Sequence, residues 1–431
     1  MSASSSSVTL HRVLYAMPAF VLAFPTIPVF VLLPTFYAET VGLGLSAVGV
    51  AFLVLRMADV VSDPLLGWIS DRIPARFGKR KLPIVIGGLL GAPALIALFT
   101  PSEHATIFHL IFWGLLLFTA WTAIQIPYLA WAAELETRYH YRTTLNGFRE
   151  GAGLLGILFV AGLGLWLADF DVFERFSVIA WATVFLGIVT ISLALYIVPQ
   201  GRPAKETASF SFPWENKLFL RILCAWFVNG FANALPAVCL PLFLIHVLQA
   251  DEQTQANLLF IYFLCAVAGI PVWVRLSARW NKNRVWCVSM ILACVVFIGV
   301  PFLGSGDFVA FGIICVLTGL ALGSDLALPT SMQADCTDWD RFRFGENRLA
   351  TLYSYWSMAT KLSLAAAVGL AFPLLDYVDL PSGNETAKLT LVVIYAGLPI
   401  VLKAVAIALM WNFPLGRKQH SALQVALERR L

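Results

Sequence analysis

Charge is scarce in this sequence of 431 residues. Asp, Glu, Lys and Arg make up 13% of it, whereas soluble domains carry roughly 25%. Hydrophobic residues reach 59%, and the mean hydropathy is +0.81. The shortage of charge excludes a soluble enzyme, a disordered chain and a protein that binds nucleic acid.

Sequence motifs of enzymes are also missing. The chain has no HExxH, no GxSxG and no GxxxxGK[ST] segment, which are the patterns of metalloproteases, serine hydrolases and nucleotide-binding loops. Its seven cysteines form no CxxC pair, so we interpret them as small core residues and not as metal ligands or disulfides. We expect a protein that is not an enzyme and has no bound cofactor.

Long apolar runs fill most of the chain. A helix needs roughly 20 apolar residues to cross the 30 Å core of a bilayer, and twelve runs meet that length. They cover 13–37, 44–70, 83–100, 106–132, 147–168, 176–199, 217–246, 255–278, 285–304, 308–333, 349–374 and 389–413. The sequence therefore predicts an all-α polytopic membrane protein with twelve transmembrane helices in a lipid bilayer.

A polar segment divides these runs into six and six. It spans 200–216, QGRPAKETASFSFPWEN. We predict an N-terminal six-helix bundle over 1–199, a cytoplasmic linker over 200–216, a C-terminal six-helix bundle over 217–413 and a cytoplasmic tail over 414–431. The halves resemble each other weakly, since GWISDRIPARFGKRK ends the second run and WVRLSARWNKNR ends the eighth. Repeats in the same orientation are typical of transporters, although any polytopic protein has basic inner loops.

Basic residues follow the even-numbered runs, and the alternate loops are acidic or neutral. The loop after the second run holds five basic residues between 72 and 81. By contrast, the loop between the seventh and eighth runs contains QADEQ and no basic residue in that segment. Because basic loops stay on the cytoplasmic side, we predict that both termini are cytoplasmic.

Three ionisable residues lie inside the second run, in VLRMADVVSDP. Arg56, Asp59 and Asp63 are spaced by three and then four residues, which places them on one helical face. Charges inside a membrane are functional candidates by default. Two carboxylates and one arginine leave a charge of −1, which sodium or lithium would neutralise; alternatively, like-charge repulsion makes one carboxyl take a proton. The structural alternative is that Arg56 only pairs with one aspartate.

Further polar residues within apolar runs suggest a central cavity. Any one of them could instead form an interhelical hydrogen bond, and Lys361 and Asp325 could pair with each other. The candidate substrate-binding residues are Trp121, Gln125, Tyr128, Arg149, Asn229, Asn233, Asp325 and Lys361.

Four segments in order carry a family resemblance. They are RMADVVSDPLLGWISDRIPARFGKRK (56–81), IPYLAWAAELETRYHYRTTLNGFRE, ADCTDWDRFRFGENR and YSYWSMATK. With them the chain resembles the glycoside–pentoside–hexuronide:cation symporters, a branch of the major facilitator superfamily that includes the melibiose permease. The resemblance implies two pseudo-symmetric six-helix bundles, alternating access, a small-molecule substrate, a monovalent cation partner (sodium, lithium or a proton), a bacterial inner membrane and a monomer.

Residue by residue, the resemblance implies roles for matched positions. The family's cation-site carboxylates fall on Asp59 and Asp63, and a hydroxyl near the cation falls on Ser357. Arg56 and Lys361 would balance charge and couple the two sites. The gating loop of major facilitators would include Gly67, Asp71, Arg72, Arg76, Gly78, Lys79 and Arg80.

The departures from the family bear on the substrate. Two aspartates that hold galactoside hydroxyls in melibiose-type carriers are replaced by Ala23 and Gln125, and a stacking tryptophan by Leu129. The cavity keeps Arg149 and Lys361, so we expect it to lean positive and to suit an anionic ligand such as a glucuronide, a sulfonated sugar or a phosphate-bearing amphiphile. Alternatively, Asp325 could restore the balance of charge from the opposite half.

We therefore expect a cation-coupled symporter of a small organic solute, most simply a glycoside or a uronide. Animal lysolipid carriers look like the same family, so a lysophospholipid or another amphiphile is the second hypothesis. A membrane-embedded enzyme or a receptor is the alternative of another class.

Overall fold

The computed structural model describes residues 5–74, 76, 78–102, 105–136, 138–167, 170–201, 212–345, 348–379 and 385–429. Across these residues the protein is all-α and contains no strand, as predicted. The long helices are α1 (Ser5–Leu22), α3 (Leu45–Arg72), α4 (Lys81–Phe99), α5 (Ile107–Leu135), α6 (Tyr139–Trp166), α7 (Val172–Ile197), α8 (Lys217–His246), α9 (Glu252–Arg279), α10 (Lys282–Phe297), α11 (Phe308–Phe344), α12 (Leu349–Tyr377) and α14 (Leu398–Met410). Shorter ones are α2 (Leu33–Thr35), α13 (Glu385–Val392) and α15 (Arg417–Glu428).

Most of these helices have the composition of membrane spans. In the described ranges, nine are long and apolar enough to cross a bilayer. The other three predicted spans fall on α1 and the turns after it, on α3 and on α6. Helix α3 has the length of a span but carries Arg56, Asp59 and Asp63 in its middle.

The first and last predicted spans are not single regular helices. Over 13–37, α1 ends at Leu22, and π-helical turns at Pro28–Leu32 and Phe36–Thr40 flank α2. Pro25, Pro28 and Pro34 lie in this stretch. Each proline lacks an N–H and displaces the carbonyl four residues before it, so the regular helix is interrupted. Another π-helical turn, Val393–Gly397, separates α13 from α14.

The chain folds as two compact units that are not two contiguous halves. Unit 1 comprises residues 1–137, 148–210 and 344–355, and unit 2 comprises 138–147, 211–343 and 356–431. The first residues of α6 thus belong to unit 2, and the first residues of α12 belong to unit 1. Residues 202–211 of the predicted linker lie outside the described residues, and the domain boundaries drawn from the sequence stay a prediction.

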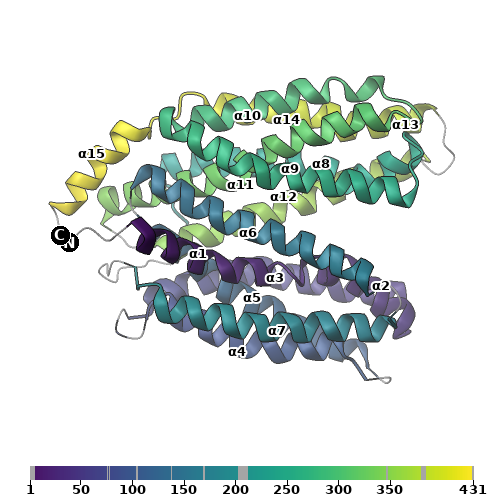
Figure 1. Ribbon diagram of the computed structural model, residues 1–431, viewed down its shortest axis with the longest axis horizontal. Helices are drawn as coiled ribbons and strands as arrows, with labels where there is room; N and C mark the ends of the chain where they lie inside the picture. The colour runs from purple at the N-terminus through teal and green to yellow at the C-terminus, as the bar shows by residue number, and fades with distance from the viewer. Residues whose placement is uncertain are drawn as a thin grey trace. The chain divides into compact units, whose positions relative to one another are not determined.

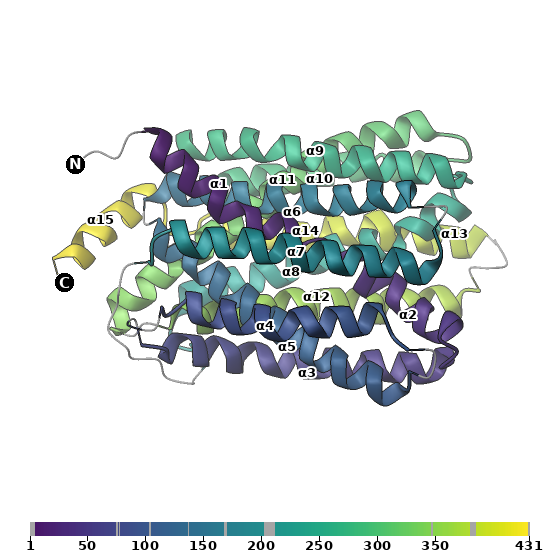
Figure 2. The same cartoon turned by 60° about the horizontal axis from the view of Figure 1, so that its bottom comes forward.

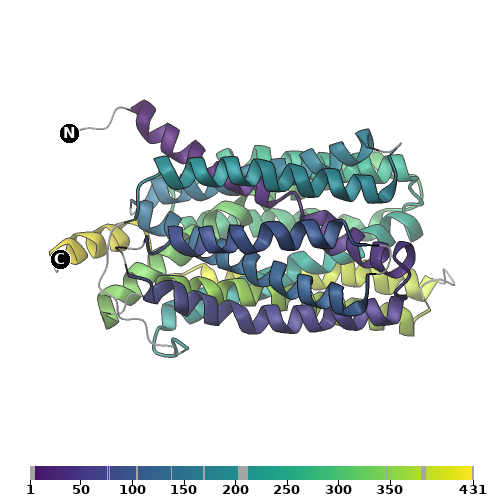
Figure 3. The same ribbon diagram turned by 90° about the horizontal axis from the view of Figure 1, so that it is seen from below.

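Each unit is built from helices packed lengthwise. In unit 1, α4 packs against α5 and α7, and α3 packs against α5, as Figures 1 and 2 show. Aromatic rings of Phe24, Phe36, Phe99 and Phe176 lie in its core. In unit 2, α14 packs against α8 and α10 (Figure 1). Figure 3 shows α15, in yellow, at the end of the chain and not alongside the long helices.

Candidate functional site

The two carboxylates of α3 meet one hydroxyl of α5. Asp59 is 3% exposed and Asp63 is fully buried. The hydroxyl oxygen of Thr122 lies 2.9 Å from Asp63 Oδ1 and 3.2 Å from Asp59 Oδ1. A hydroxyl has one proton to donate, so it bonds one carboxylate at a time. Two acidic oxygens around one hydroxyl, in an apolar helix pair, favour the binding of a proton or a hard cation that takes oxygen ligands.

Arg56, one turn before Asp59, faces aromatic rings. Its guanidinium lies 4.3 Å from the centre of the Phe30 ring and 5.8 Å from that of Phe118. It also interacts electrostatically with Asp59. A cation over a ring face gains attraction from the ring itself, and Arg56 can also balance part of the charge of the pair.

A second polar group in unit 1 gathers around Arg149 of α6. The guanidinium pairs with the neighbouring Glu150. Tyr15 of α1 donates to the carbonyl of Tyr128 at 2.6 Å, and Tyr128 donates to the carbonyl of Tyr15. Glu150 thus offsets the charge of Arg149, and the Tyr128 hydroxyl is engaged by the backbone.

Trp121 and Gln125 lie on the same helix, α5. Trp121 lines an apolar cavity of about 400 Å³ between α1, α4, α5 and α7, with its ring 6.4 Å from that of Phe30. Gln125 is half-buried one turn further along. The candidate residue Trp121 therefore lies in apolar surroundings.

In unit 2, Asp325 of α11 is held by three neighbouring helices. Its carboxylate accepts hydrogen bonds from Asn229 at 3.2 Å, from Asn233 at 2.8 Å and from the indole of Trp286. Lys403 of α14 donates to the side-chain oxygens of Asn229 and Asn233 at 2.9 and 2.7 Å and lies 3.9 Å from Asp325. Each asparagine thus donates to the aspartate and accepts from the lysine.

The cation beside Asp325 is therefore Lys403 and not Lys361. Both members of the pair are buried, at 6% and 3% exposure, and a buried ion pair of this kind is tolerable only when hydrogen bonds complete it. The network borders a cavity of about 160 Å³ with mostly apolar walls, into which Tyr262 and Tyr395 also project. Asn229, Asn233 and Asp325 are brought together, as a set of substrate-binding residues would require.

Ser357 and Lys361 lie one turn apart on α12, in the part that belongs to unit 2, and both are half-buried. Asp59 and Asp63 belong to unit 1. A cation site made of Asp59, Asp63 and Ser357 stays a prediction.

The predicted gating loop centres on Asp71, at the end of α3. Its carboxylate accepts from the backbone N–H groups of Ala350 and Thr351 at 2.9 and 2.7 Å and from the Thr351 hydroxyl at 2.9 Å. Carboxylates at a helix N-terminus satisfy its free N–H groups and favour its dipole. Asp71 thus holds the first turn of α12 within unit 1.

Arg80 completes this arrangement, which we call the Asp71 cluster: Asp71, Arg80 and Glu134. The Arg80 guanidinium lies 2.9 Å from Asp71 and 2.7 Å from Glu134 of α5. Burial lowers the pKa of Arg80, but the two carboxylates raise it by more, so that the pKa lies above its usual value. Arg80 therefore keeps its charge and acts as a brace between the end of α3 and α5.

The other predicted loop residues surround this brace. Gly67 packs so closely on α12 that a Cβ there would lie 2.7 Å from the carbonyl oxygen of Ala350. Arg72 stacks on Trp68 at 4.1 Å. Gly78 has a φ of +76°, a conformation that favours glycine. Lys79 is buried and Arg76 is exposed.

Several residues of these sites were missed in the sequence. Lys403 had the clearest signal, since it is an ionisable residue inside the twelfth apolar run. Glu150 directly follows Arg149, and Glu134 lies two residues after the fourth run. Thr122 had no signal that separates it from other buried hydroxyls, which usually bond their own helix.

Comparisons with known proteins place this fold. A family model described as MFS/sugar transport protein matches residues 13–417. The glucuronide carrier protein homolog of Escherichia coli (strain K12) is 20% identical over 423 residues, covering 92% of this chain and 90% of that protein. The sodium-dependent lysophosphatidylcholine symporter 1-A of Danio rerio is 21% identical over 435 residues, covering 88% and 81%.

Solved structures agree on the fold. The structure of the proton:xylose symporter XylE bound to 6-bromo-6-deoxy-D-glucose superposes with a TM-score of 0.70 over 97% of this chain and 98% of that chain, at 13% identity. The family match covers nearly the whole sequence and confirms the resemblance seen in its motifs. The chain therefore belongs to the MFS/sugar transport family of the major facilitator superfamily.

Proposed function

We propose that the protein is a secondary transporter, and not an enzyme, that couples the uptake of a small organic solute to a monovalent cation bound at Asp59 and Asp63. The observation that carries this proposal is the Thr122 hydroxyl within 3.2 Å of both buried carboxylates. Sodium, lithium or a proton would neutralise the pair. A bound cation can drive a change of state only by binding one state more tightly, and neutralising a buried charge provides such a difference.

Glycosides and uronides are the substrates that we propose. Family membership and the glucuronide carrier homolog of Escherichia coli support this class. Arg149, Lys361 and the Asn229–Asn233–Asp325 group would contact the solute, with Arg149 acting together with Glu150. The protein would work as a monomer in the bacterial inner membrane, with both termini in the cytoplasm.

The test is solute accumulation in proteoliposomes with a sodium, lithium or proton gradient. We expect Asp59→Asn, Asp63→Asn and Thr122→Val to abolish accumulation above the level reached without a gradient. Thr190→Val is the matched control, because that hydroxyl bonds the Leu186 carbonyl of its own helix at 2.8 Å. Accumulation by Asp59→Asn or Asp63→Asn equal to that of the wild type would show that the coupling cation binds elsewhere.

An amphiphile such as a lysophospholipid is the second candidate substrate. The apolar cavity beside Trp121 favours it, as does the lysophosphatidylcholine symporter of Danio rerio. The same proteoliposomes, supplied with a glucoside, a glucuronide and lysophosphatidylcholine, separate the two classes. If lysophosphatidylcholine alone accumulates on the gradient, the sugar proposal is wrong and the cation site stands.

A further inference from the structure

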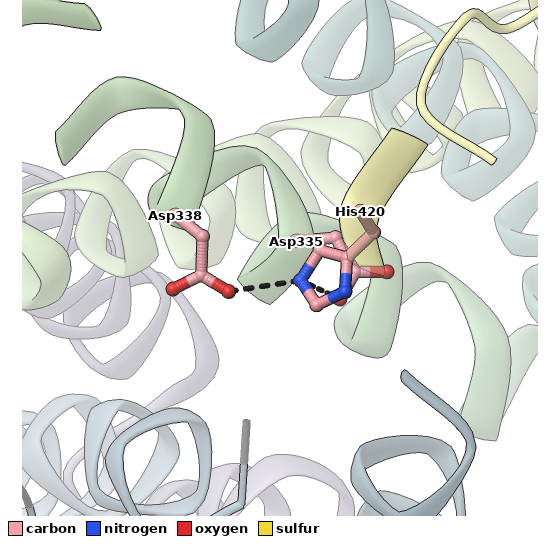
Figure 4. Close-up of side chains that lie close together, drawn as sticks. All are labelled: Asp335, Asp338 and His420. Carbon is pink, nitrogen blue, oxygen red and sulfur yellow. Dashed lines mark hydrogen bonds and ion pairs between the residues drawn. The ribbon is translucent and has the colours of Figure 1, made fainter. Parts of the chain in front are cut away.

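A cluster of mostly buried charged side chains in unit 2 has no part in the proposed sites. We call it the Asp335 cluster: Asp335 and Asp338 of α11, Arg142 of α6, Lys282 of α10 and His420 of α15. Arg142 lies 2.8 Å from Asp335 and 2.8 Å from Asp338, and Lys282 lies 2.6 Å from Asp335. His420 is 1% exposed, and Figure 4 shows its ring directed at the two carboxylates.

Arg142 and His420 use the same two oxygen atoms. Arg142 Nη1 contacts Asp335 Oδ1 and Asp338 Oδ2. His420 Nε2 lies 3.0 Å from that Asp338 oxygen and 3.4 Å from that Asp335 oxygen, and it lies 3.5 Å from Arg142 Nη1. The imidazole thus stands where it can replace the guanidinium as the donor to both carboxylates.

Two aspartates and a histidine are also the donor types of a metal site. Here the carboxylate oxygens already accept from Arg142, from Lys282 and, on Asp338, from Gln424 at 2.7 Å. A metal ion would have to displace two cations from their partners. We therefore interpret the cluster as a network of ion pairs.

The charges around His420 come from four helices. Helix α11 presents Asp335 and Asp338, α6 presents Arg142 and the ring of Tyr139 at 5.7 Å, and α10 presents Lys282. On its own helix, Gln424 is uncharged, and the charge of Arg417 acts on Tyr139.

Counting these charges gives the direction of the effect. Among these five side chains, with Arg142 in place and a neutral His420, two cations balance two carboxylates. If Arg142 leaves, a neutral His420 leaves a buried charge of −1, whereas a protonated His420 restores balance. Conversely, a protonated His420 makes the cluster with Arg142 carry +1. Uncompensated buried charge is costly, so a proton on His420 favours departure of Arg142.

We propose that His420 is a proton-binding site that substitutes for Arg142, so that proton binding releases the first residues of α6 from α11. Residues 138–147 belong to unit 2 and the rest of α6 to unit 1. Resting on the proposed function as a transporter, this release would be part of the transport cycle, and it would be favoured at low pH.

Hydrogen exchange of the backbone of residues 139–147, in the purified full-length protein, tests this without a substrate. We would compare wild type, His420→Gln and His420→Lys at about pH 6 and about pH 7.5, the range in which histidine changes charge. Gln424→Leu is the matched control, since Gln424 donates to the same Asp338 oxygen but does not titrate. Comparing variants at one pH removes the intrinsic pH dependence of exchange.

We expect wild type to exchange roughly fivefold faster than His420→Gln at about pH 6 and equally at about pH 7.5, a typical size for coupling between two sites. His420→Lys, always charged, should exchange fast at both values, and Gln424→Leu should keep the wild-type pH response. Equal exchange of wild type and His420→Gln at about pH 6 would overturn the proposal, as would protection in His420→Lys. If a His420 variant does not fold, Gln424→Leu still tests the proposal, because this variant keeps His420. Loss of its pH response would then overturn the proposal. If His420→Gln changes the pH response of hydrogen exchange but not that of solute uptake, the link to transport is contradicted and the proton site stands.

Discussion

The Asp71 cluster of unit 1 and the Asp335 cluster of unit 2 each hold the first residues of a long helix, and they do so by different chemistry. Asp71 binds the backbone N–H groups of α12, with Arg80 and Glu134 behind it. Asp335 and Asp338 bind a side chain of α6, Arg142, and share it with His420. The Asp71 cluster is a helix cap supported by an ion pair. The Asp335 cluster is a set of ion pairs in which His420 can take the place of Arg142.

This difference determines what each cluster can respond to. Backbone N–H groups do not titrate, and Arg80 keeps its charge, so neither of these groups changes near neutral pH. The hold on α6 depends on the balance of four charged side chains and one histidine. Of the two clusters, the second is the one that includes a histidine, the residue type that changes charge in the physiological range.

The largest expected effect comes from removing the shared cation. Arg142→Met leaves the buried Asp335 and the half-buried Asp338 with Lys282 as the other ion-pair partner of Asp335, and we expect the free energy of unfolding to fall by about 3–5 kcal/mol. Thermal unfolding in detergent measures this. The double variant Arg142→Met/Asp338→Leu should recover part of the loss, and a double variant as unstable as the single one would mean that charge balance does not stabilise the cluster.

A smaller effect is expected at the helix cap. Asp71→Asn keeps one acceptor oxygen for the first turn of α12 but loses the charge that faces Arg80, and we expect a loss of about 2 kcal/mol. Glu134 still pairs with Arg80, which is why the loss should be smaller than for Arg142→Met. Thermal unfolding of the two variants side by side checks the order, and the reverse order would contradict the distinction between a cap and a set of ion pairs.

The smallest expected effect on stability comes from adding a methyl group at a glycine that packs closely on another helix of its own unit. Gly67→Ala would place a Cβ 2.7 Å from a backbone oxygen of Ala350, which cannot move alone, so we expect a loss of about 1 kcal/mol or more. Gly147→Ala on α6 would meet the Ile270 side chain at 2.9 Å, and a side chain can shift. The unfolding temperature of Gly147→Ala should therefore drop less than that of Gly67→Ala. Equal drops would show that the Ile270 side chain is as rigid as the backbone of Ala350.

The α3 site shows how far periodicity alone reaches. Spacing of three and four residues predicted that Arg56, Asp59 and Asp63 share a face, and Thr122 of α5 does meet both carboxylates from one side. The partner itself was not predictable, because a threonine in an apolar run most often bonds its own helix. Lys361 was one predicted partner of Asp325, and the structure gives Lys403 instead. The sequence could not choose between the two lysines, because both lie in apolar runs and spacing along one helix does not reveal which helices are its neighbours.

What the sequence determined by itself is the membrane character of the protein, its twelve apolar segments, the four family motifs and the face of α3 that carries the acids. These follow from hydropathy and from the 3.6-residue period, which are local properties of the chain. Only the tertiary structure decided that Glu150 neutralises Arg149, that Lys403 stands beside Asp325 and that α15 brings His420 to the carboxylates of α11. Each of these joins residues on different helices or fixes a side-chain direction, and such pairings depend on how the helices pack and not on any local pattern.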